Sequence, residues 1–180
     1  MGAVIAVEIV SLLVSAINSY EGRPADGPIP DPSQITREQV EVRAGRGLVG
    51  DRYFNRPAHR NASVTVIAAE SLDRLREDLG LLMPIDPLLT RRNIVLRGFP
   101  IDELAAQRGT PGAIFSLDSG AGPVRFQANR PANPCAWMDA VIAKGAFKGL
   151  RGHGGVRCTP LDDGLLRLGP ANLVTPAGYP

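Results

Sequence analysis

The sequence predicts a single, mainly β domain in which short strands are separated by many turns. Its 180 residues fall in the usual size range of one domain with one core, and 44% of them are hydrophobic. Twenty glycines and 16 prolines imply frequent chain reversals, which favour short strands over a helical bundle. No internal repeat or long linker divides the chain, so residues 1–180 are expected to form one domain.

Strands are predicted where apolar residues alternate or run together between turn signals. They are expected at residues 3–14, 39–42, 64–68, 93–96, 113–117, 124–129, 156–160 and 165–168. Asp163-Gly164 is a hairpin signal, which predicts that the last two strands pair with each other. The segment RPANPC is expected to be irregular, because Pro131 and Pro134 lack the amide hydrogen that a strand ladder needs.

A helix is predicted over residues 70–79, where leucines recur at helical spacing and Gly80 can end it. Asp86 followed by Pro87 is typical of a capped helical turn. The remaining expected elements are short helices at 101–107 and 137–144 and a Pro/Gly-rich loop at 18–33.

The charge balance argues against a nucleic-acid partner. Twenty Lys and Arg against 18 Asp and Glu leave a net charge of only +2. Eighteen of the basic residues are Arg, whose rigid fork of donors suits phosphates and oxyanions, although GC-rich codon usage explains the same excess. Each arginine must therefore be judged by its neighbours.

The apolar N-terminus, residues 1–17, is interpreted as buried strand. Glu8 interrupts the apolar run, and no basic residue precedes Arg23, whereas a signal peptide needs an early positive charge and a membrane span needs an uncharged run. We therefore expect a cytoplasmic protein without membrane contact.

Cys135 is the most informative position for chemistry. The proline-restricted loop before it and the predicted helix after it put its thiol near a helix start, where unpaired amides favour a thiolate, and Arg130 can add positive charge. A thiolate is a strong ligand for soft metals and a good nucleophile. A free Cys is equally often a small buried hydrophobe, and the local sequence leaves both interpretations open. Cys158, inside a predicted strand, is interpreted as structural, and a disulfide between the two is not expected.

Further polar candidates flank predicted strands and Gly-rich turns. Arg91 and Arg92 are adjacent, so on a strand only one of them can face a given site. Asn93 can orient an arginine or a ligand oxygen. Arg52 ends one Gly-rich turn and Arg151 begins another, where backbone can approach a ligand closely or simply turn tightly. The sequence contains no P-loop, zinc motif or Ser-His-Asp pattern.

Five segments occur in the order and spacing typical of MOSC domains: GRGLVGDRYF, VTVIAAESLDRL, RRNIVLRG, RPANPC and LRGHGGVRC. The chain resembles a stand-alone, bacterial-type member of this family from about Val7 to its last strand. The same module forms the C-terminus of molybdenum cofactor sulfurases and occurs in molybdenum proteins that reduce oximes and hydroxylamines. The resemblance implies a mainly β, barrel-like fold with a few short peripheral helices.

The resemblance also implies a site. Cys135 corresponds to the family's cysteine, which in catalytic relatives ligates molybdenum held by the pterin dithiolene of the molybdenum cofactor, molybdopterin. The paired N–H donors of arginine suit the phosphate and oxo-metal groups of this cofactor. The positions that match the family's basic and amide residues are Arg52, Arg91, Asn93, Arg130 and Arg151. We expect the arginines and Cys135 to converge on a cleft at one end of the barrel.

Three functions remain open from the sequence. The first is a molybdenum-dependent oxidoreductase that reduces small N-hydroxylated compounds with electrons from a redox partner protein. The second is a non-catalytic carrier of molybdenum cofactor or of its sulfur. The third is a metal-free thiol protein with Cys135 as nucleophile. Pyridoxal phosphate is not expected to bind covalently, because Lys144 and Lys148 match no Schiff-base motif. The sequence does not indicate an oligomeric state.

Overall fold

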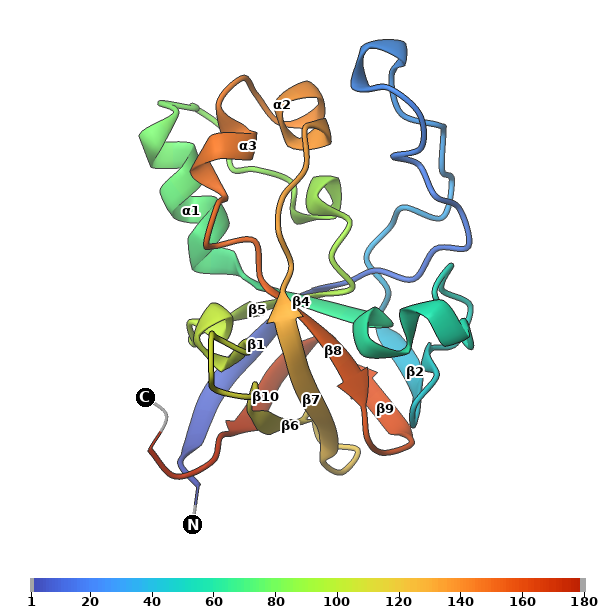
Figure 1. The fold of residues 1–180 in the computed structure, drawn as a ribbon, viewed down its shortest axis with the longest axis vertical. Helices are drawn as coiled ribbons and strands as arrows, with labels where there is room; N and C mark the ends of the chain where they lie inside the picture. Colours follow the sequence, from blue (N-terminus) through green and yellow to red (C-terminus); the bar gives the residue numbers. More distant parts are fainter. Residues whose placement is uncertain (1, 179–180) are drawn as a thin grey trace.

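The computed structural model describes residues 2–178 and is built around a closed barrel of strands in the order β1-β10-β6-β7-β8-β4-β5 (Figure 1). These strands are β1 (Val4–Leu12), β4 (Val64–Ala68), β5 (Ile94–Arg97), β6 (Ile114–Asp118), β7 (Val124–Pro131), β8 (Val156–Pro160) and β10 (Gly169–Val174). Only β4 and β5 run parallel; the other neighbours in the barrel are antiparallel. The expected mainly β, barrel-like fold is confirmed.

The barrel interior is filled by alternate side chains of its strands. Along β7, Val124, Phe126 and Ala128 are buried while Arg125 between them is exposed. Phe126 stacks on Phe115 of β6 with ring centroids 5.5 Å apart. This period-two pattern is the one by which a strand buries one face and solvates the other.

A second small sheet lies beside the barrel and has the order β3-β2-β9. It comprises β2 (Gln39–Arg43), β3 (Gly47–Leu48) and β9 (Gly164–Arg167). Its existence overturns the predicted hairpin around Asp163-Gly164. β8 pairs with β4 and β7 in the barrel, whereas β9 pairs with β2. The side chains of Asp162 and Asp163 hold the backbone amides of Arg125 and Ala44, so the connection links two sheets instead of closing a hairpin.

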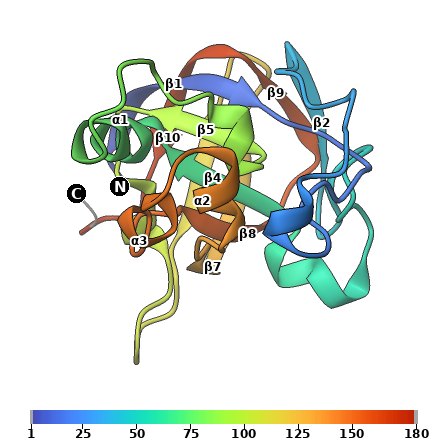
Figure 2. The ribbon, with the colours of Figure 1, turned by 90° about the horizontal axis from the view of Figure 1, so that it is seen from above.

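The helices gather at one end of the barrel, as the end-on view of Figure 2 also shows. They are α1 (Ala69–Asp78), α2 (Trp137–Val141) and α3 (Ala146–Gly149), with 3-10 helices η1 (Pro24–Asp26), η2 (Pro57–Ala62), η3 (Pro87–Thr90) and η4 (Ile101–Leu104). Leu72 and Leu75 of α1 pack with Trp137 against Ile67 of β4 and Val95 of β5. The parallel strands β4 and β5 are therefore covered on both faces. Among residues 2–178, no helix has the length and apolarity needed to cross a membrane.

Two further predictions near the chain's middle need correction. Arg130 and Pro131 continue β7 and pair with Arg157 and Val156, because a bulge after Ala128 places the proline at the strand end, where its missing amide is tolerated. The helix expected over residues 137–144 stops at Val141 and restarts as α3. Gly145, with a φ of 101°, is the residue that precedes α3.

Candidate functional site

The two cysteines have opposite environments. Cys135 is exposed in the loop that leaves β7, whereas Cys158 points into the barrel core and is fully buried. Burial raises the pKa of the Cys158 thiol far above its ordinary value. α2 begins only at Trp137 and has five residues, so the helix start that the sequence predicted for Cys135 contributes little dipole.

Arg92 joins the Cys135 loop to the Gly-rich loop before β8. Its Nε donates to the Gly154 carbonyl at 2.9 Å, and its Nη2 donates to the Ala132 carbonyl at 2.7 Å. Burial and, to a smaller degree, the charge of Arg157 lower the pKa of Arg92 to about 10, while a thiolate at Cys135 acts in the opposite direction. The guanidinium therefore stays charged at neutral pH and lies within electrostatic reach of Cys135.

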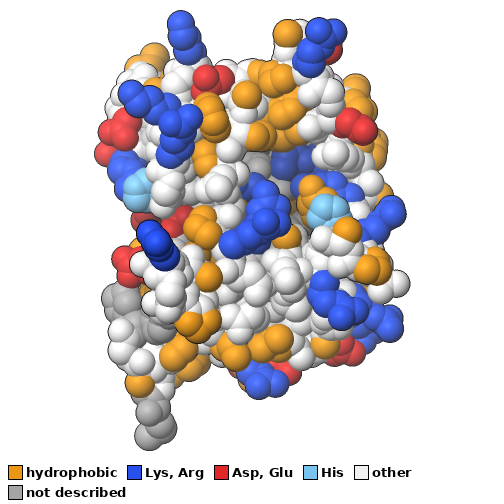
Figure 3. Space-filling model, in the orientation of Figure 1, with side chains coloured by type: hydrophobic (Ala, Val, Ile, Leu, Met, Phe, Trp, Pro, Cys, Tyr) orange, Lys and Arg blue, Asp and Glu red, His pale blue; other side chains and the backbone are white. Residues whose placement is uncertain are grey.

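Two more arginines lie side by side where β7 and β8 meet. Arg130 and Arg157 are paired in the strand register, with Arg130 exposed and Arg157 half-buried. Burial lowers the pKa of Arg157, and the charge of Arg130 lowers it further, while Tyr53 and Cys135 oppose both. Two positive charges next to each other repel unless an anion lies between or beside them. Figure 3 shows Lys and Arg side chains gathered near the middle of the molecular surface in this view, next to a hollow.

Arg52 supplies the donors that the chain leaves unused. Its Nε and Nη1 are buried and have no hydrogen-bond partner among residues 2–178. The carboxylate of Asp51 lies 3.7 Å from Nη1, too far for a hydrogen bond, and the guanidinium lies 4.6 Å from the Tyr53 ring centroid. A buried unpaired donor is costly, so these N–H groups are suited to an acceptor supplied from outside the chain. Arg52 also acts electrostatically on Arg92 and Arg157, which places all three in one neighbourhood.

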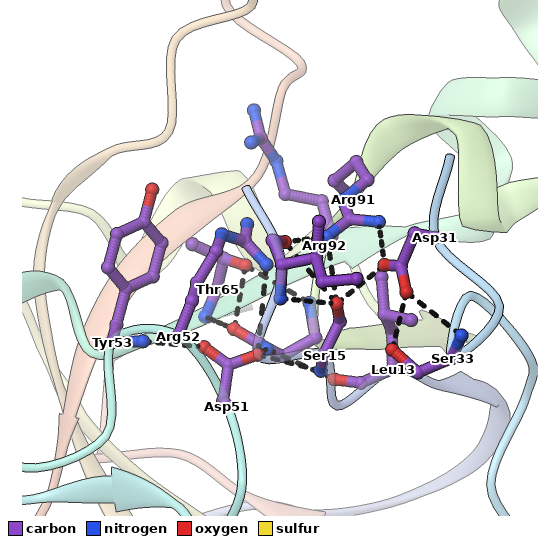
Figure 4. A network of polar contacts seen from close by, with 12 residues as sticks. Leu13, Ser15, Asp31, Ser33, Asp51, Arg52, Tyr53, Thr65, Arg91 and Arg92 are labelled. Carbon is purple, nitrogen blue, oxygen red and sulfur yellow. Dashed lines mark hydrogen bonds and ion pairs between the residues drawn. The ribbon is translucent and has the colours of Figure 1, made fainter. Parts of the chain in front are cut away.

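Asn93 belongs to the frame behind Arg52. Its Nδ2 donates to the Asp51 carboxylate at 3.0 Å and to the Leu13 carbonyl at 3.1 Å, and its Oδ1 accepts from the amide and hydroxyl of Thr65 (Figure 4). Burial raises the pKa of Asp51 although Arg52 and several hydrogen bonds oppose it. With its amide group fully engaged, Asn93 positions Asp51, which lies beside Arg52.

Arg91 turns away from Arg92 into an internal ion pair. Its Nη1 donates to Asp31 at 2.6 Å (Figure 4). Nη1 also donates to Gln34 at 2.9 Å, and Nη2 donates to the Ile17 carbonyl at 2.6 Å. Arg91 has a left-handed φ of 55°, because η3 ends there, and this turn sends the two adjacent side chains to different neighbours. Its donors hold the loop 15–34 against η3.

Arg151 lies beside the loop that carries Cys135. It is exposed, its guanidinium covers the Phe147 ring at 4.7 Å from the centroid, and it lines a hollow of about 410 Å³ with Asn133 and Pro134. The structure therefore brings Cys135, Arg52, Arg130 and Arg151 into one neighbourhood, keeps Asn93 behind Arg52, and turns Arg91 toward Asp31.

Arg92 and Arg157 complete the group, although neither was among the expected cofactor residues. Arg92 stood beside Arg91 as an alternative, and the sequence offered no way to choose between them. The sequence around Arg157 did not indicate a role in the site, because Arg157 comes close to Arg130 only through the pairing of β7 with β8. Among residues 2–178, no three or more His, Cys, Asp and Glu side chains cluster as ligands for a metal ion.

Comparisons with known proteins agree with the fold. The family model described as MOSC domain matches residues 49–169. Among solved structures, the YuaD protein from Bacillus subtilis superimposes with a TM-score of 0.72 at 16% identity, covering 97% of this chain and 98% of that one. YiiM from Geobacillus stearothermophilus superimposes with a TM-score of 0.59 at 20% identity, covering 94% of this chain and 74% of that one. YiiM from Escherichia coli superimposes with a TM-score of 0.59 at 14% identity, covering 98% of this chain and 72% of that one. A comparison with curated proteins finds no match. Because the matched family segment spans most of the chain and contains Arg52, Arg92, Arg130, Cys135 and Arg157, the chain belongs to the MOSC domain family.

Proposed function

We propose that this MOSC protein binds molybdenum cofactor and reduces small N-hydroxylated compounds with electrons from a redox partner protein. The observation that carries the proposal is one exposed thiol, Cys135, in a loop that the buried Arg92 holds and that follows the strand end where Arg130 and Arg157 are paired. A thiolate suits a soft metal, and forked donors suit an anionic, phosphate-bearing group. The unpaired N–H groups of Arg52 support the same assignment, because they need an acceptor that the chain does not provide.

In this function the protein's residues bind and orient. Cys135 would be the single protein ligand to the metal, Arg52 would donate Nε and Nη1 to an anionic group, and Arg130 and Arg157 would offset negative charge at the strand ends. Arg92 keeps the Cys135 loop in place through its bonds to Ala132 and Gly154. The bound cofactor would supply the two-electron chemistry. Overall the N–O bond breaks, the hydroxyl oxygen leaves as water, two electrons come from the donor and two protons from solvent.

The test is to produce the chain in a host that makes the cofactor and in a matched host that does not. We expect close to one molybdenum per chain from the first host only, measured by mass spectrometry of the metal, together with the pterin released on denaturation. Cys135→Ser should lose most of the metal without loss of fold, since a hydroxyl is a poorer ligand for molybdenum. Arg52→Met should lower pterin occupancy, while Arg108→Met, the matched control at an exposed arginine outside the site, should not.

Turnover separates the proposal from the carrier alternative. With a reduced viologen as electron source, the loaded protein should convert a hydroxylamine to the amine, and the Cys135→Ser variant should not. A loaded protein that never turns over would be a carrier of the cofactor. Wild-type protein without molybdenum from the competent host would contradict the proposal and leave the metal-free thiol function.

A further inference from the structure

Basic and acidic residues are segregated along the chain in spite of the small net charge. Three segments, residues 52–69, 119–138 and 140–161, contain no Asp or Glu, although the chain has 18 of them. The Lys and Arg residues in these segments are Arg52, Arg56, Arg60, Arg125, Arg130, Lys144, Lys148, Arg151 and Arg157. The chain therefore carries a local positive excess that its overall composition hides.

The three segments are neighbours in space. They contain β4, β7 and β8, and β8 pairs with both of the other strands. The loop around η2 is tied to the same strands, because the Thr159 hydroxyl donates to the Arg60 carbonyl at 2.8 Å and the Asn129 amide donates to the Asn61 carbonyl at 3.0 Å. We call the surface of these segments the basic face. Cys135 lies within it, and in Figure 3 acidic side chains lie mostly toward the edges of the view.

The charges of the basic face are not neutralised by the chain. Six of its basic residues are exposed and take part in no ion pair among residues 2–178: Arg56, Arg60, Arg130, Lys144, Lys148 and Arg151. By contrast, some arginines outside the face are paired with acids, such as Arg97 with Asp73 at 2.7 Å. Asp139, the one acid between the second and third segments, accepts from the amides of Gly145 and Phe147. The face keeps a net positive field around Cys135.

We infer that the basic face is the docking surface for an electron-donor protein with an acidic face. This inference rests on the proposed function, which takes electrons from a protein partner. Electron-transfer encounters bury little surface, so long-range charge attraction contributes much of their rate. A donor that docks by charge on this face brings its redox centre close to Cys135, where the electrons are needed.

A nucleic acid is the other polyanion that a basic face attracts. The side chains of this face suit a nucleic acid less well than an acidic protein. Single strands bind by stacking bases on exposed aromatic rings as well as by charge. Trp137 is buried, and Tyr53 already contacts Arg52 and His59, with the His59 ring centroid 4.5 Å away. Phe126 is buried, Phe147 lies under Arg151 and Phe54 is half-buried, so the face offers charge with few free aromatic rings.

The test compares two electron sources on charge-reversed variants of the loaded protein. The face variants are Arg56→Glu/Arg60→Glu and Lys144→Glu/Lys148→Glu, and the matched control is Arg108→Glu/Arg167→Glu, which makes the same charge change at exposed positions outside the three segments. With an acidic flavodoxin as donor, KM should rise about tenfold or more in the face variants at low salt, and the difference should shrink at about 0.5 M salt. With reduced viologen, all variants should match the wild type.

The outcomes separate this inference from the proposed function. No turnover with either electron source would contradict the proposed function itself. Turnover with viologen, combined with equal flavodoxin KM in face and control variants, would overturn the docking inference alone. Binding is also measured directly by anisotropy of labelled flavodoxin and of a single-stranded oligonucleotide of about 20 nucleotides. Tighter binding of the oligonucleotide at the same salt, weakened by the face variants, would assign the surface to nucleic acid and reject the donor.

Discussion

Cys135 and Cys158 differ in access to solvent, and this difference decides which of them can react. A small alkylating agent should modify one thiol per native chain, at Cys135, because Cys158 is sealed in the barrel and its raised pKa keeps it protonated. In denaturant both thiols should react. Thiol counting and peptide mapping check this, with Cys135→Ser as the control that should show no native labelling. Preferential native modification of Cys158 would contradict it.

Arg91 and Asp31 form a buried ion pair whose loss should be costly. Their side chains are 4% and 1% exposed, and Nη1 lies 2.6 Å from the carboxylate. Arg91→Met leaves the Asp31 charge buried without its partner, so the free energy of unfolding should fall by about 3–5 kcal/mol. Arg97→Met removes an exposed ion pair with Asp73 and should cost less than about 1 kcal/mol. Urea unfolding of both variants measures the contrast, and equal losses would contradict the assignment.

The same carboxylate should make stability depend on pH in acid. Burial alone would raise the pKa of Asp31, but hydrogen bonds from Ser15, Ser33 and Arg91 outweigh it and hold the pKa well below its usual range. A depressed pKa stabilises the fold above the unfolded value of about 4, and this contribution is lost as pH falls below it. The stability advantage of wild type over Asp31→Asn should therefore shrink from about pH 5 to about pH 2 in unfolding titrations. A constant advantage would show that the charge of Asp31 contributes nothing.

At the scale of elements, the glycines of the loop 151–155 determine how closely the backbone before β8 approaches β4. Gly155 has a φ of 91°, and a Cβ there would lie 2.0 Å from the Val66 carbonyl oxygen of β4. Gly152 also has a positive φ, of 77°, but nothing lies within 4 Å of its Cβ position. Both Gly→Ala changes incur the left-handed penalty, and Gly155→Ala should cost about 1–3 kcal/mol more because it displaces packed backbone.

Chemical unfolding of the two glycine variants measures this difference. The rate of Cys135 alkylation provides a second readout, because Arg92 bonds the neighbouring Gly154 carbonyl to the Cys135 loop. We expect the rate to change in Gly155→Ala and to stay close to that of wild type in Gly152→Ala. Equal stability and equal rates in both variants would show that the loop moves freely.

At the scale of the whole molecule, the barrel and its helical end share two strands. β4 and β5 send Val66 and Leu96 into the barrel core and Ile67 and Val95 outward, into the helical cluster around Trp137. We therefore expect the helical end and the barrel to unfold together. The fluorescence of Trp137, the single tryptophan, should report the same urea midpoint as far-UV circular dichroism. An earlier fluorescence transition would show that the helical end unfolds as a separate unit.

The amino-acid sequence determined what short-range physics controls. Leucines at helical spacing placed α1, the alternation of apolar residues placed most strands, and Asp86 caps η3 through the Leu88 amide as its position predicts. The segments resembling MOSC domains indicated both the family and the barrel. These signals are local, because propensity, capping and periodicity act within one element.

Only the tertiary structure decided which elements and side chains meet. The local hairpin signal at Asp163-Gly164 lost to long-range pairing of β9 with β2, because register and partner depend on burying both sheets. The adjacent Arg91 and Arg92 were equivalent in the sequence, and a left-handed turn sent one to Asp31 and the other toward Cys135. Arg157 joined the site through strand pairing alone. Contacts between residues far apart in the chain depend on packing and backbone geometry, which no short stretch of sequence encodes.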